Sequence, residues 1–284
     1  LISGVSLSGD RFFYQNPLES AGKHERSAWF EVACCPADVA RFLPTLPGYM
    51  YASGGDSVYI NLFAAGSARV ELRGRSVDLI QETKYPWEGT IKILVNARPG
   101  GTFTVRLRIP GWARNEPVPT DLYRFLEGGE QPVRLWINRK PIEIKLEKGY
   151  AVLRRKWRSN DLIELILSMP NRRVVAHDLV KENKGRVALQ RGPIVFCAEG
   201  IDNGGKALNL VLPDEAKLQH WFRPDLLGGV AIITANAVAV DQSAHGKTLS
   251  ERMHPLMAVP YFAWANRGPG EMRVWLPRTS AALK

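Results

Sequence analysis

The feature that most constrains the fold of this 284-residue chain is a two-residue alternation of apolar and polar side chains that begins near Asp56. Residues 58–62, 91–95 and 103–109 all show the pattern. Successive side chains of a strand point to opposite faces, so the alternation predicts antiparallel strands with one buried and one solvated face. More strands are predicted at residues 133–137, 142–146, 151–154 and 162–167. Evenly spaced strands without a long intervening helix are typical of a β-sandwich.

A second series of strands is predicted after Met169-Pro170, which closes the first series. Its members are residues 186–190, 194–198, 208–212 and 230–240. The polar stretch 241–252 is interpreted as a loop. Two final strands, 261–264 and 272–276, flank the turn Gly268-Pro269-Gly270. The pattern therefore predicts a second sandwich.

The first 50 residues differ from the rest because they contain the helical spacing of apolar residues that the later segments lack. Val39, Phe42, Leu43 and Leu46 recur at that spacing, and Pro36 fits the first turn of such a helix. We expect Pro44 to shorten or kink it, because proline cannot donate a hydrogen bond to the carbonyl of Ala40.

Composition excludes several classes of protein. The net charge is +10, but the basic residues are scattered singly along strands, which favours a solvated sheet face over a nucleic-acid partner. No apolar run reaches the roughly 18 residues that span a bilayer, so no membrane association is predicted. The chain has no initiator Met and no secretory leader at its start, which suggests a fragment.

Two of the three cysteines, Cys34 and Cys35, are adjacent. Neighbouring cysteines rarely bridge, because the small ring strains the intervening peptide bond. Free thiols or metal ligands suit a reducing compartment, so a cytoplasmic location is expected, with the periplasm as the alternative. A position just before a helix favours the thiolate, which attacks carbon or binds zinc. The pair alone remains compatible with inert buried thiols.

Several segments together resemble glycoside hydrolase family 127, which contains the β-L-arabinofuranosidases. They occur in the same order along the whole chain. The segments are Phe12-Phe13-Tyr14-Gln15-Asn16-Pro17-Leu18-Glu19, Trp29-Phe30 through Cys34-Cys35-Pro36, Gly48-Tyr49-Met50-Tyr51-Ala52, Tyr85-Pro86-Trp87-Glu88-Gly89, Leu107-Arg108-Ile109-Pro110-Gly111-Trp112, Gly185-Arg186-Val187-Ala188-Leu189-Gln190-Arg191-Gly192-Pro193 and Pro260-Tyr261-Phe262-Ala263-Trp264-Ala265-Asn266-Arg267-Gly268.

The resemblance implies a mainly β chain, in which two β-sandwich (jelly-roll-like) domains follow the last piece of an (α/α)6 catalytic barrel. Residues 1–53 would be the barrel remnant. Residues 54–169 would form the first sandwich, completed by about 256–278, and residues 170–255 the second. An orphaned barrel piece would expose Phe12, Phe13, Trp29, Phe30, Val39 and Phe42. A missing barrel segment or a second copy in a homodimer would then cover them.

The resemblance also implies site roles. Cys34 would be the nucleophile and a zinc ligand, and Cys35 a second zinc ligand. Two further ligands, a glutamate and a cysteine, and the acid/base glutamate would lie upstream of this chain. The implied activity is release of β-L-arabinofuranose or a related sugar, with retention, from a plant-derived oligosaccharide or glycoconjugate. This chain alone would be inactive.

Alternatives remain for the chain and for single residues. It could be a non-catalytic β-sandwich that binds carbohydrate or a partner, although such a protein needs no cysteine pair. A thiol redox or metal-trafficking protein would be expected to show Cys-x-x-Cys, which is absent. Cys197 is interpreted as a buried thiol, and the histidines His24, His177, His220, His245 and His254 show no metal-ligand spacing. His24 could reach the cysteine pair, and Glu19 and Glu31 could line a sugar pocket, with surface or capping roles as the alternatives. Trp87, Trp112 and Trp264 could stack on sugar rings, although core packing is favoured for them.

Overall fold

The computed structural model describes residues 2–129, 132–242 and 249–283, so His245 lies outside the described residues. The prediction of a mainly β chain is confirmed, with 47% of residues in strands and 13% in helices. The chain forms two compact units. Unit 1 contains Leu1–Arg41, Pro117–Gly128 and Pro170–Lys284, and unit 2 contains Phe42–Glu116 and Gly129–Met169. The boundaries of these units differ from those of the three predicted segments: residues 42–53 belong to unit 2, and residues 117–128 belong to unit 1.

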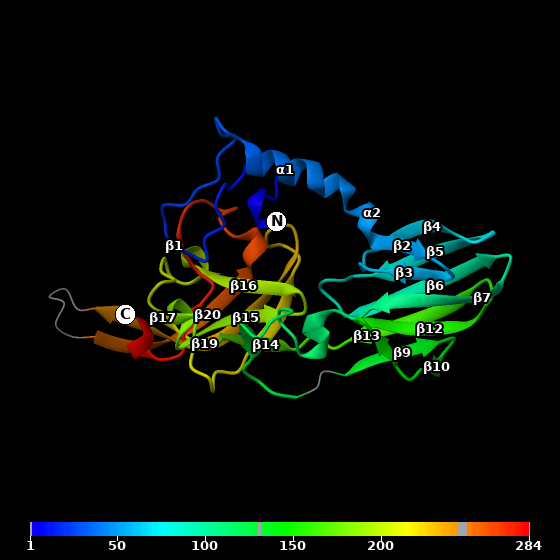
Figure 1. Cartoon of the computed structure of the whole chain (residues 1–284). Helices are drawn as coiled ribbons and strands as arrows, with labels where there is room; N and C mark the ends of the chain where they lie inside the picture. The colour runs from blue at the N-terminus through cyan, green and yellow to red at the C-terminus, as the bar shows by residue number, and fades with distance from the viewer. Residues whose placement is uncertain (1, 130–131, 243–248, 284) are drawn as a thin grey trace. The chain divides into compact units, whose positions relative to one another are not determined.

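Unit 2 is built from two sheets. A six-stranded sheet has the order β10-β9-β13-β6-β5-β4, and a five-stranded sheet has the order β11-β12-β7-β3-β2 (Figure 1). Every pairing is antiparallel except the one between β3 and β7, which is parallel. The strands are β2 Tyr51–Gly54, β3 Ser57–Ile60, β4 Gly66–Leu72, β5 Arg75–Thr83, β6 Thr90–Arg98, β7 Gly101–Arg108, β9 Val133–Ile137, β10 Lys140–Pro141, β11 Leu146–Glu147, β12 Tyr150–Trp157 and β13 Asp161–Leu167.

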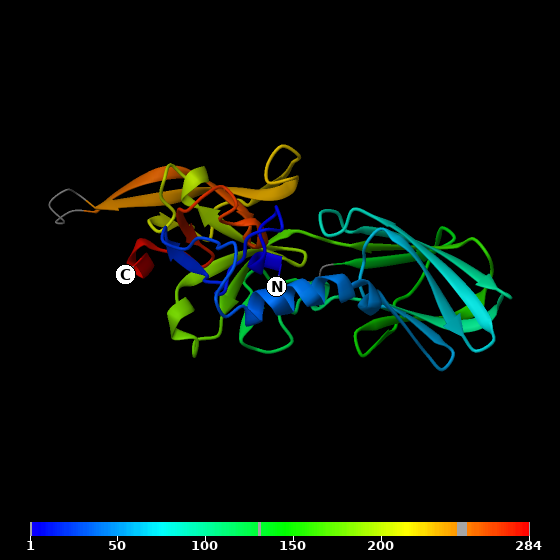
Figure 2. The same cartoon turned by 90° about the horizontal axis from the view of Figure 1, so that it is seen from above.

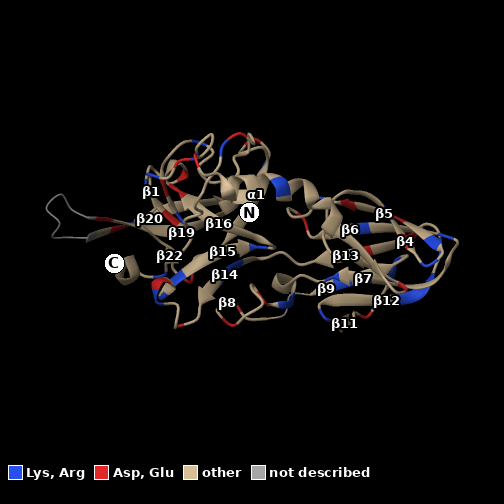
Figure 3. Cartoon of the chain, turned by 45° about the horizontal axis from the view of Figure 1, so that its top comes forward, with Lys and Arg blue, Asp and Glu red and all other residues tan. Residues whose placement is uncertain are grey.

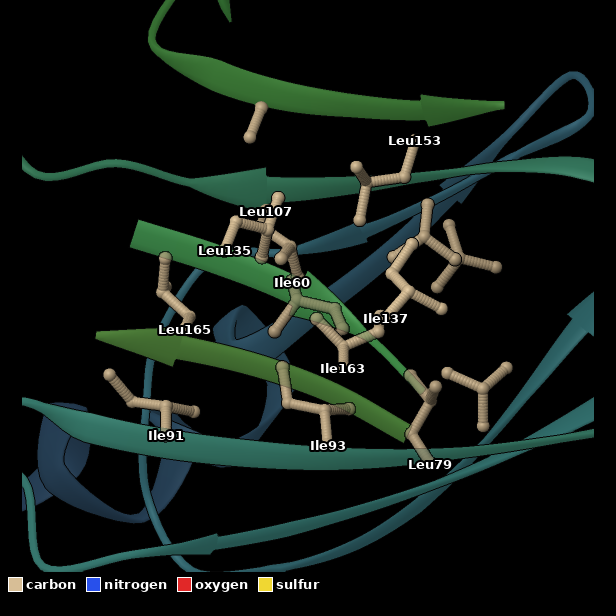
Figure 4. Packing of buried hydrophobic residues seen from close by; sticks show 14 of the residues in the cluster. Ile60, Leu79, Ile91, Ile93, Leu107, Leu135, Ile137, Leu153, Ile163 and Leu165 are labelled. Carbon is tan, nitrogen blue, oxygen red and sulfur yellow. The ribbon is translucent and has the colours of Figure 1, made fainter. Parts of the chain in front are cut away.

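The core of unit 2 explains the sequence pattern. Along β13 every second residue is buried, and Ile163 and Leu165 are fully enclosed. They meet Ile60 and Leu107 of the other sheet and Ile93 of β6 (Figure 4). Burying an aliphatic side chain of this size contributes roughly 1.5–3 kcal/mol. The apolar side chains of the alternating pattern therefore pack between the two sheets, as the sequence predicted.

Gly89 belongs to the segment Tyr85-Pro86-Trp87-Glu88-Gly89, and its role is steric. Its carbonyl accepts a 2.9 Å hydrogen bond from the amide of Leu167. A Cβ at this position would collide with the carbonyl oxygen of Leu167. Only glycine allows the two backbones to approach this closely.

Unit 1 contains an eleven-stranded sheet whose main path is β17-β19-β20-β16-β15-β14-β8, with β1, β18, β21 and β22 branching from it. Its longest hairpin, β19–β20, is the extended yellow-orange ribbon in Figure 2. The strands are β1 Glu19–Ala21, β8 Tyr123–Phe125, β14 Asn171–Ala176, β15 Arg186–Arg191, β16 Ile194–Glu199, β17 Leu210–Val211, β18 Gln219–Arg223, β19 Val230–Gln242, β20 Leu249–Pro260, β21 Glu271–Arg273 and β22 Leu276–Pro277.

Helices are short. Helix α1 covers Cys34–Phe42 and α2 covers Pro47–Met50. The predicted effect of Pro44 is confirmed, because α1 ends at Phe42 and a 3-10 turn that contains Pro44 follows. The 3-10 helices are Ile2–Gly4, Leu43–Thr45, Gly111–Arg114, Lys181–Asn183, Gly200–Asp202, Tyr261–Ala263 and Ser280–Leu283.

Four details of the sequence-based assignment are wrong. Residues 142–146 are not a strand, because β10 ends at Pro141, β11 starts at Leu146, and the residues between them are in neither. Residues 256–278 do not complete the first sandwich, because β20 pairs with β19 and β16, β21 with β16 and β22 with β15. Residues 241–252 were expected to form a loop, but both ends of this stretch are in strands, because β19 runs to Gln242 and β20 starts at Leu249; residues 243–248 lie outside the described residues. Residues 261–263 form a 3-10 helix rather than a strand.

Candidate functional site

The first 41 residues belong to unit 1 and are paired with its C-terminal part. Strand β1 pairs with β21, and Arg273 Nε donates a 2.9 Å hydrogen bond to Glu19 Oε2. Phe12 and Ser27 exchange two backbone hydrogen bonds, of 2.8 and 3.0 Å. This bridge places residues 12–14 next to the stretch that leads to the two thiols.

The expectation that Phe12 and Phe13 are exposed is wrong. Only 9% of Phe12 and 7% of Phe13 remain accessible. Phe13 stacks on Trp264 with ring centroids 4.9 Å apart, and Phe12 meets Trp29 edge to face at 5.4 Å. Trp29, at 55%, is still exposed, so only part of the apolar surface finds cover within unit 1.

The two candidate thiols lie in the first turn of α1, one or two residues further into the helix than the sequence suggested. Cys34 and Cys35 are its first two residues, and the amide of Ala37 bonds to the carbonyl of Ala33 at 3.1 Å. The amides of the first turn have no acceptor within the helix, and the helix dipole adds positive potential there. Both thiols are free and exposed, so an anionic sulfur suits this position.

Tyr14 completes the local site, and the sequence gave it no role. Its hydroxyl lies 2.7 Å from Cys34 Sγ, and its ring meets Phe30 edge to face at 5.2 Å. The hydrogen bond between them raises the pKa of Tyr14 to about 12. The same bond lowers the pKa of Cys34, whereas the neighbouring sulfur of Cys34 raises the pKa of Cys35. Cys34 is therefore the thiol that ionises first, with the phenol as donor to its sulfur.

The spacing of the two thiols fits a metal. Their sulfur atoms lie 3.7 Å apart. In a tetrahedral zinc site with Zn–S bonds of about 2.3 Å, two sulfurs lie roughly 3.8 Å apart. Across the described ranges, no group of three His, Cys, Asp or Glu residues is arranged to hold a metal ion. Cys34 and Cys35 therefore match one edge of a four-ligand site.

Most of the remaining candidates have structural surroundings. Cys197 is buried in β16, and burial raises the pKa of its thiol well above the ordinary value. Glu19 accepts hydrogen bonds from Arg273 and Arg186, and His24 Nδ1 lies 2.9 Å from Ser20 Oγ. Trp264 is buried, which confirms core packing for it, and Trp112 packs against the core of unit 2. The structure does not bring any of these together with Cys34 through a hydrogen bond or ring contact.

The charge pattern agrees with the sequence interpretation. Lys and Arg occur on separate strands and loops of both units (Figure 3). Several are paired with carboxylates, as in Arg69–Asp78 and Arg278–Asp214. Among the described helices, none is long and apolar enough to cross a membrane.

Comparison with protein-family models identifies three consecutive matches. Residues 1–48 match the GH127 catalytic domain of the β-L-arabinofuranosidases, residues 57–169 match the GH127 middle domain, and residues 171–277 match the C-terminal domain of glycoside hydrolase family 127. The order agrees with the resemblance noted in the sequence.

Individual proteins match over almost the whole chain. A curated non-reducing end β-L-arabinofuranosidase of Bifidobacterium longum subsp. longum is 33% identical, over 98% of this chain and 43% of its own length. A solved GH127 β-arabinofuranosidase is 41% identical with a TM-score of 0.95, over 99% of this chain and 44% of its own. A GH127 β-L-arabinofuranosidase from Geobacillus stearothermophilus T6 is 40% identical with a TM-score of 0.87, over 97% of this chain and 44% of its own. This chain spans less than half the length of these relatives.

Proposed function

The chain belongs to glycoside hydrolase family 127, and we propose that it forms part of a retaining glycosidase that releases β-L-arabinofuranose through a cysteine nucleophile, Cys34. The observation that carries the proposal is the exposed Cys34 sulfur at the start of α1, with the Tyr14 hydroxyl 2.7 Å away. A thiolate held there is an accessible nucleophile. The family relatives whose names specify β-L-arabinofuranosidase supply the substrate class.

The first half of the reaction forms a bond between Cys34 and the sugar. The thiolate uses a lone pair to attack the anomeric carbon, and the bond from that carbon to the leaving oxygen breaks with its electron pair on oxygen. A general acid must protonate this oxygen. We expect a carboxyl group in the remainder of the catalytic domain to act as that acid, because none bonds to Cys34 or Tyr14 among the described residues.

The second half returns the enzyme to its starting state. Water, deprotonated by the same carboxylate, attacks the anomeric carbon from the opposite side, and the carbon–sulfur bond breaks with its electrons on sulfur. Two inversions give net retention. The Tyr14 hydroxyl donates to the departing thiolate and so favours its release.

Zinc is the cofactor we propose, because the two sulfurs lie 3.7 Å apart, as on an edge of a tetrahedral site. When bound, the ion would keep both cysteines deprotonated at neutral pH. Cys35 would serve as a ligand only, since the 2.7 Å contact of the Tyr14 hydroxyl is with the Cys34 sulfur. The site needs about two more ligands, so we propose that this chain alone is inactive.

The test uses the protein that joins this chain to a complete catalytic domain. Hydrolysis of an aryl β-L-arabinofuranoside should release β-L-arabinofuranose as the first product, which NMR detects before mutarotation. Cys34→Ala should abolish turnover. Cys197→Ala is the matched control, because it removes a buried thiol in β16 and should leave turnover close to wild type. Inverted product, or full activity of Cys34→Ala, would exclude this mechanism.

A further inference from the structure

Arg26 is a buried arginine within the loop-rich segment that carries the thiols. Only 4% of it is accessible. Its Nη1 donates a 2.6 Å hydrogen bond to the carbonyl of Trp264, and its Nη2 donates a 3.0 Å bond to the carbonyl of Ser3. Burial lowers the pKa of Arg26 to about 10, so the guanidinium stays charged at neutral pH. A buried cation held by two carbonyls fixes the backbone around it.

The Phe13 ring lies between this guanidinium and a tryptophan. The Arg26 guanidinium carbon is 4.3 Å from the Phe13 centroid. The other contact is a stack on Trp264, with centroids 4.9 Å apart and planes 14° apart. Trp264 therefore contacts Arg26 through its carbonyl and Phe13 through its ring. The three residues form one clamp between segments more than 230 positions apart in sequence.

The C-terminal side of this clamp is itself fixed. The amide of Ala265 donates a 2.9 Å hydrogen bond to Glu199 Oε1, and Arg267 pairs with Glu199 at 2.6 Å. Glu199 ends β16, a strand in the middle of the sheet of unit 1. Asn266 Nδ2 also bonds the carbonyl of Ala263 at 2.8 Å. The position of Trp264 is thereby tied to the sheet.

We propose that Arg26 is a positioning residue, which acts through Phe13 to hold the Tyr14 hydroxyl against the Cys34 sulfur. Tyr14 follows Phe13 directly in the chain, and its hydroxyl lies 2.7 Å from Cys34 Sγ. Arg26 touches neither of those two groups. Through these contacts the sheet of unit 1 fixes the position of Phe13, and therefore that of the neighbouring Tyr14. The effect of the clamp on catalysis rests on the proposed function. The stabilisation of residues 12–14 and 27 by the clamp does not.

Arginine is required for this role because its planar group does three things at once. It bonds two carbonyls in different directions and lies over a ring. A lysine ammonium keeps the charge but lacks the flat fork. The matched control is Arg173 of β14, which is 6% accessible and bonds to Glu127, Pro213 and Ala216, none of them in the first 41 residues. Arg26→Lys and Arg173→Lys thus compare the same change at two buried sites.

Hydrogen exchange on this chain tests whether the clamp stabilises the segment around Phe13, and it requires no enzymatic activity. The amides of Phe12, Phe13 and Ser27 are hydrogen-bonded and should exchange slowly. Arg26→Lys should speed their exchange roughly tenfold or more, since loss of a hydrogen bond to a charged group loosens the segment locally. Arg173→Lys should not. Unchanged exchange in Arg26→Lys, or equal loss of protection in both variants, overturns the clamp. If Arg26→Lys does not fold, Phe13→Leu decides in the same way.

Kinetics on the protein with a complete catalytic domain test the catalytic part. Arg26→Lys should lower kcat about 10- to 100-fold with little change in KM, because small displacements of reacting groups cost rates of that order. Combined with Tyr14→Phe, it should cause no further loss, since both changes remove the same contact. Additive losses overturn the positioning role. A wild-type protein without arabinofuranosidase activity overturns the proposed function, and the exchange result then still judges the clamp separately.

Discussion

Phe13→Ala should destabilise unit 1 alone, because the ring is 7% accessible and lies between Trp264 and the Arg26 guanidinium. Truncation of a buried phenylalanine to alanine costs about 3–5 kcal/mol. The side chain bridges the first 41 residues and the C-terminal part of unit 1, so the loss should fall on the docking of that segment. A cost of about 4 kcal/mol corresponds to a fall of roughly 10 °C in Tm for a unit of this size.

The assay is hydrogen exchange in increasing urea, which reports the unfolding free energy of each unit separately. Unit 1 should lose about 4 kcal/mol, and unit 2 should be unchanged. Phe103→Ala is the matched control. Phe103 is 1% accessible and packs on Trp157 within unit 2, so it should destabilise unit 2 instead. If Phe13→Ala leaves unit 1 as stable as before, the first 41 residues are not docked as described.

Three further predictions concern other contacts. In the protein with a complete catalytic domain, Cys35→Ser should lower the zinc content measured by elemental analysis, because the Cys35 sulfur lies 3.7 Å from the Cys34 sulfur. Cys197→Ser should leave the zinc content unchanged, since this thiol is buried elsewhere. Equal zinc content in both variants would contradict Cys35 as a ligand. Glu199→Gln should destabilise unit 1 by about 1.5–3 kcal/mol in urea unfolding, because it removes one of the two carboxylates that pair with Arg267 and leaves only Asp202; a change below about 0.5 kcal/mol would contradict this. Arg278 holds the pKa of Asp214 below its usual range, so the stabilisation from this pair is complete above the ordinary carboxyl pKa and is lost as pH falls through the lowered pKa. The Tm difference between wild type and Asp214→Asn should therefore shrink between about pH 5 and pH 2. A difference that stays constant over this range would refute the pH dependence of the pair.

The sandwich of unit 2 could be predicted because its strands bury one face and expose the other, which leaves a two-residue alternation in the sequence. Strand β9 coincides with the predicted residues 133–137, since Leu135 and Ile137 are buried and the flanking residues are polar. Strands β4 and β5 were missed. Their sequence nevertheless carries the same alternation, because buried residues such as Val70 and Leu79 are interleaved with charged residues such as Arg69 and Asp78, which pair across the strands.

The C-terminal strands of unit 1 were harder to predict for a physical reason. Near the start of β20 the exposed residues Glu251 and Arg252 lie on opposite faces of the strand, so the alternation that holds from Met253 onward is absent there. Asp241, for example, bonds Arg252 across the hairpin, although both lie in a stretch whose composition is typical of a loop. Composition alone does not distinguish an exposed strand from a loop.

The candidate site was predictable only in part. The adjacent cysteines before a helix are visible in the sequence, and the structure places them in its first turn. The contact between Tyr14 and Cys34 depends on the Phe12–Ser27 bridge and on the Arg26 clamp. Those are long-range contacts that no local pattern encodes. Tyr14 lies within one of the segments that carry the family resemblance, and that was its only signal.

The proposed mechanism depends most directly on the Cys34 sulfur being the atom that bonds to the sugar. Mass spectrometry of the protein with a complete catalytic domain, after treatment with an arabinofuranose-configured epoxide, would locate the covalent adduct. We expect one adduct, on the peptide that contains Cys34 and on that sulfur. An adduct on Cys35 or on a carboxylate would contradict Cys34 as the nucleophile.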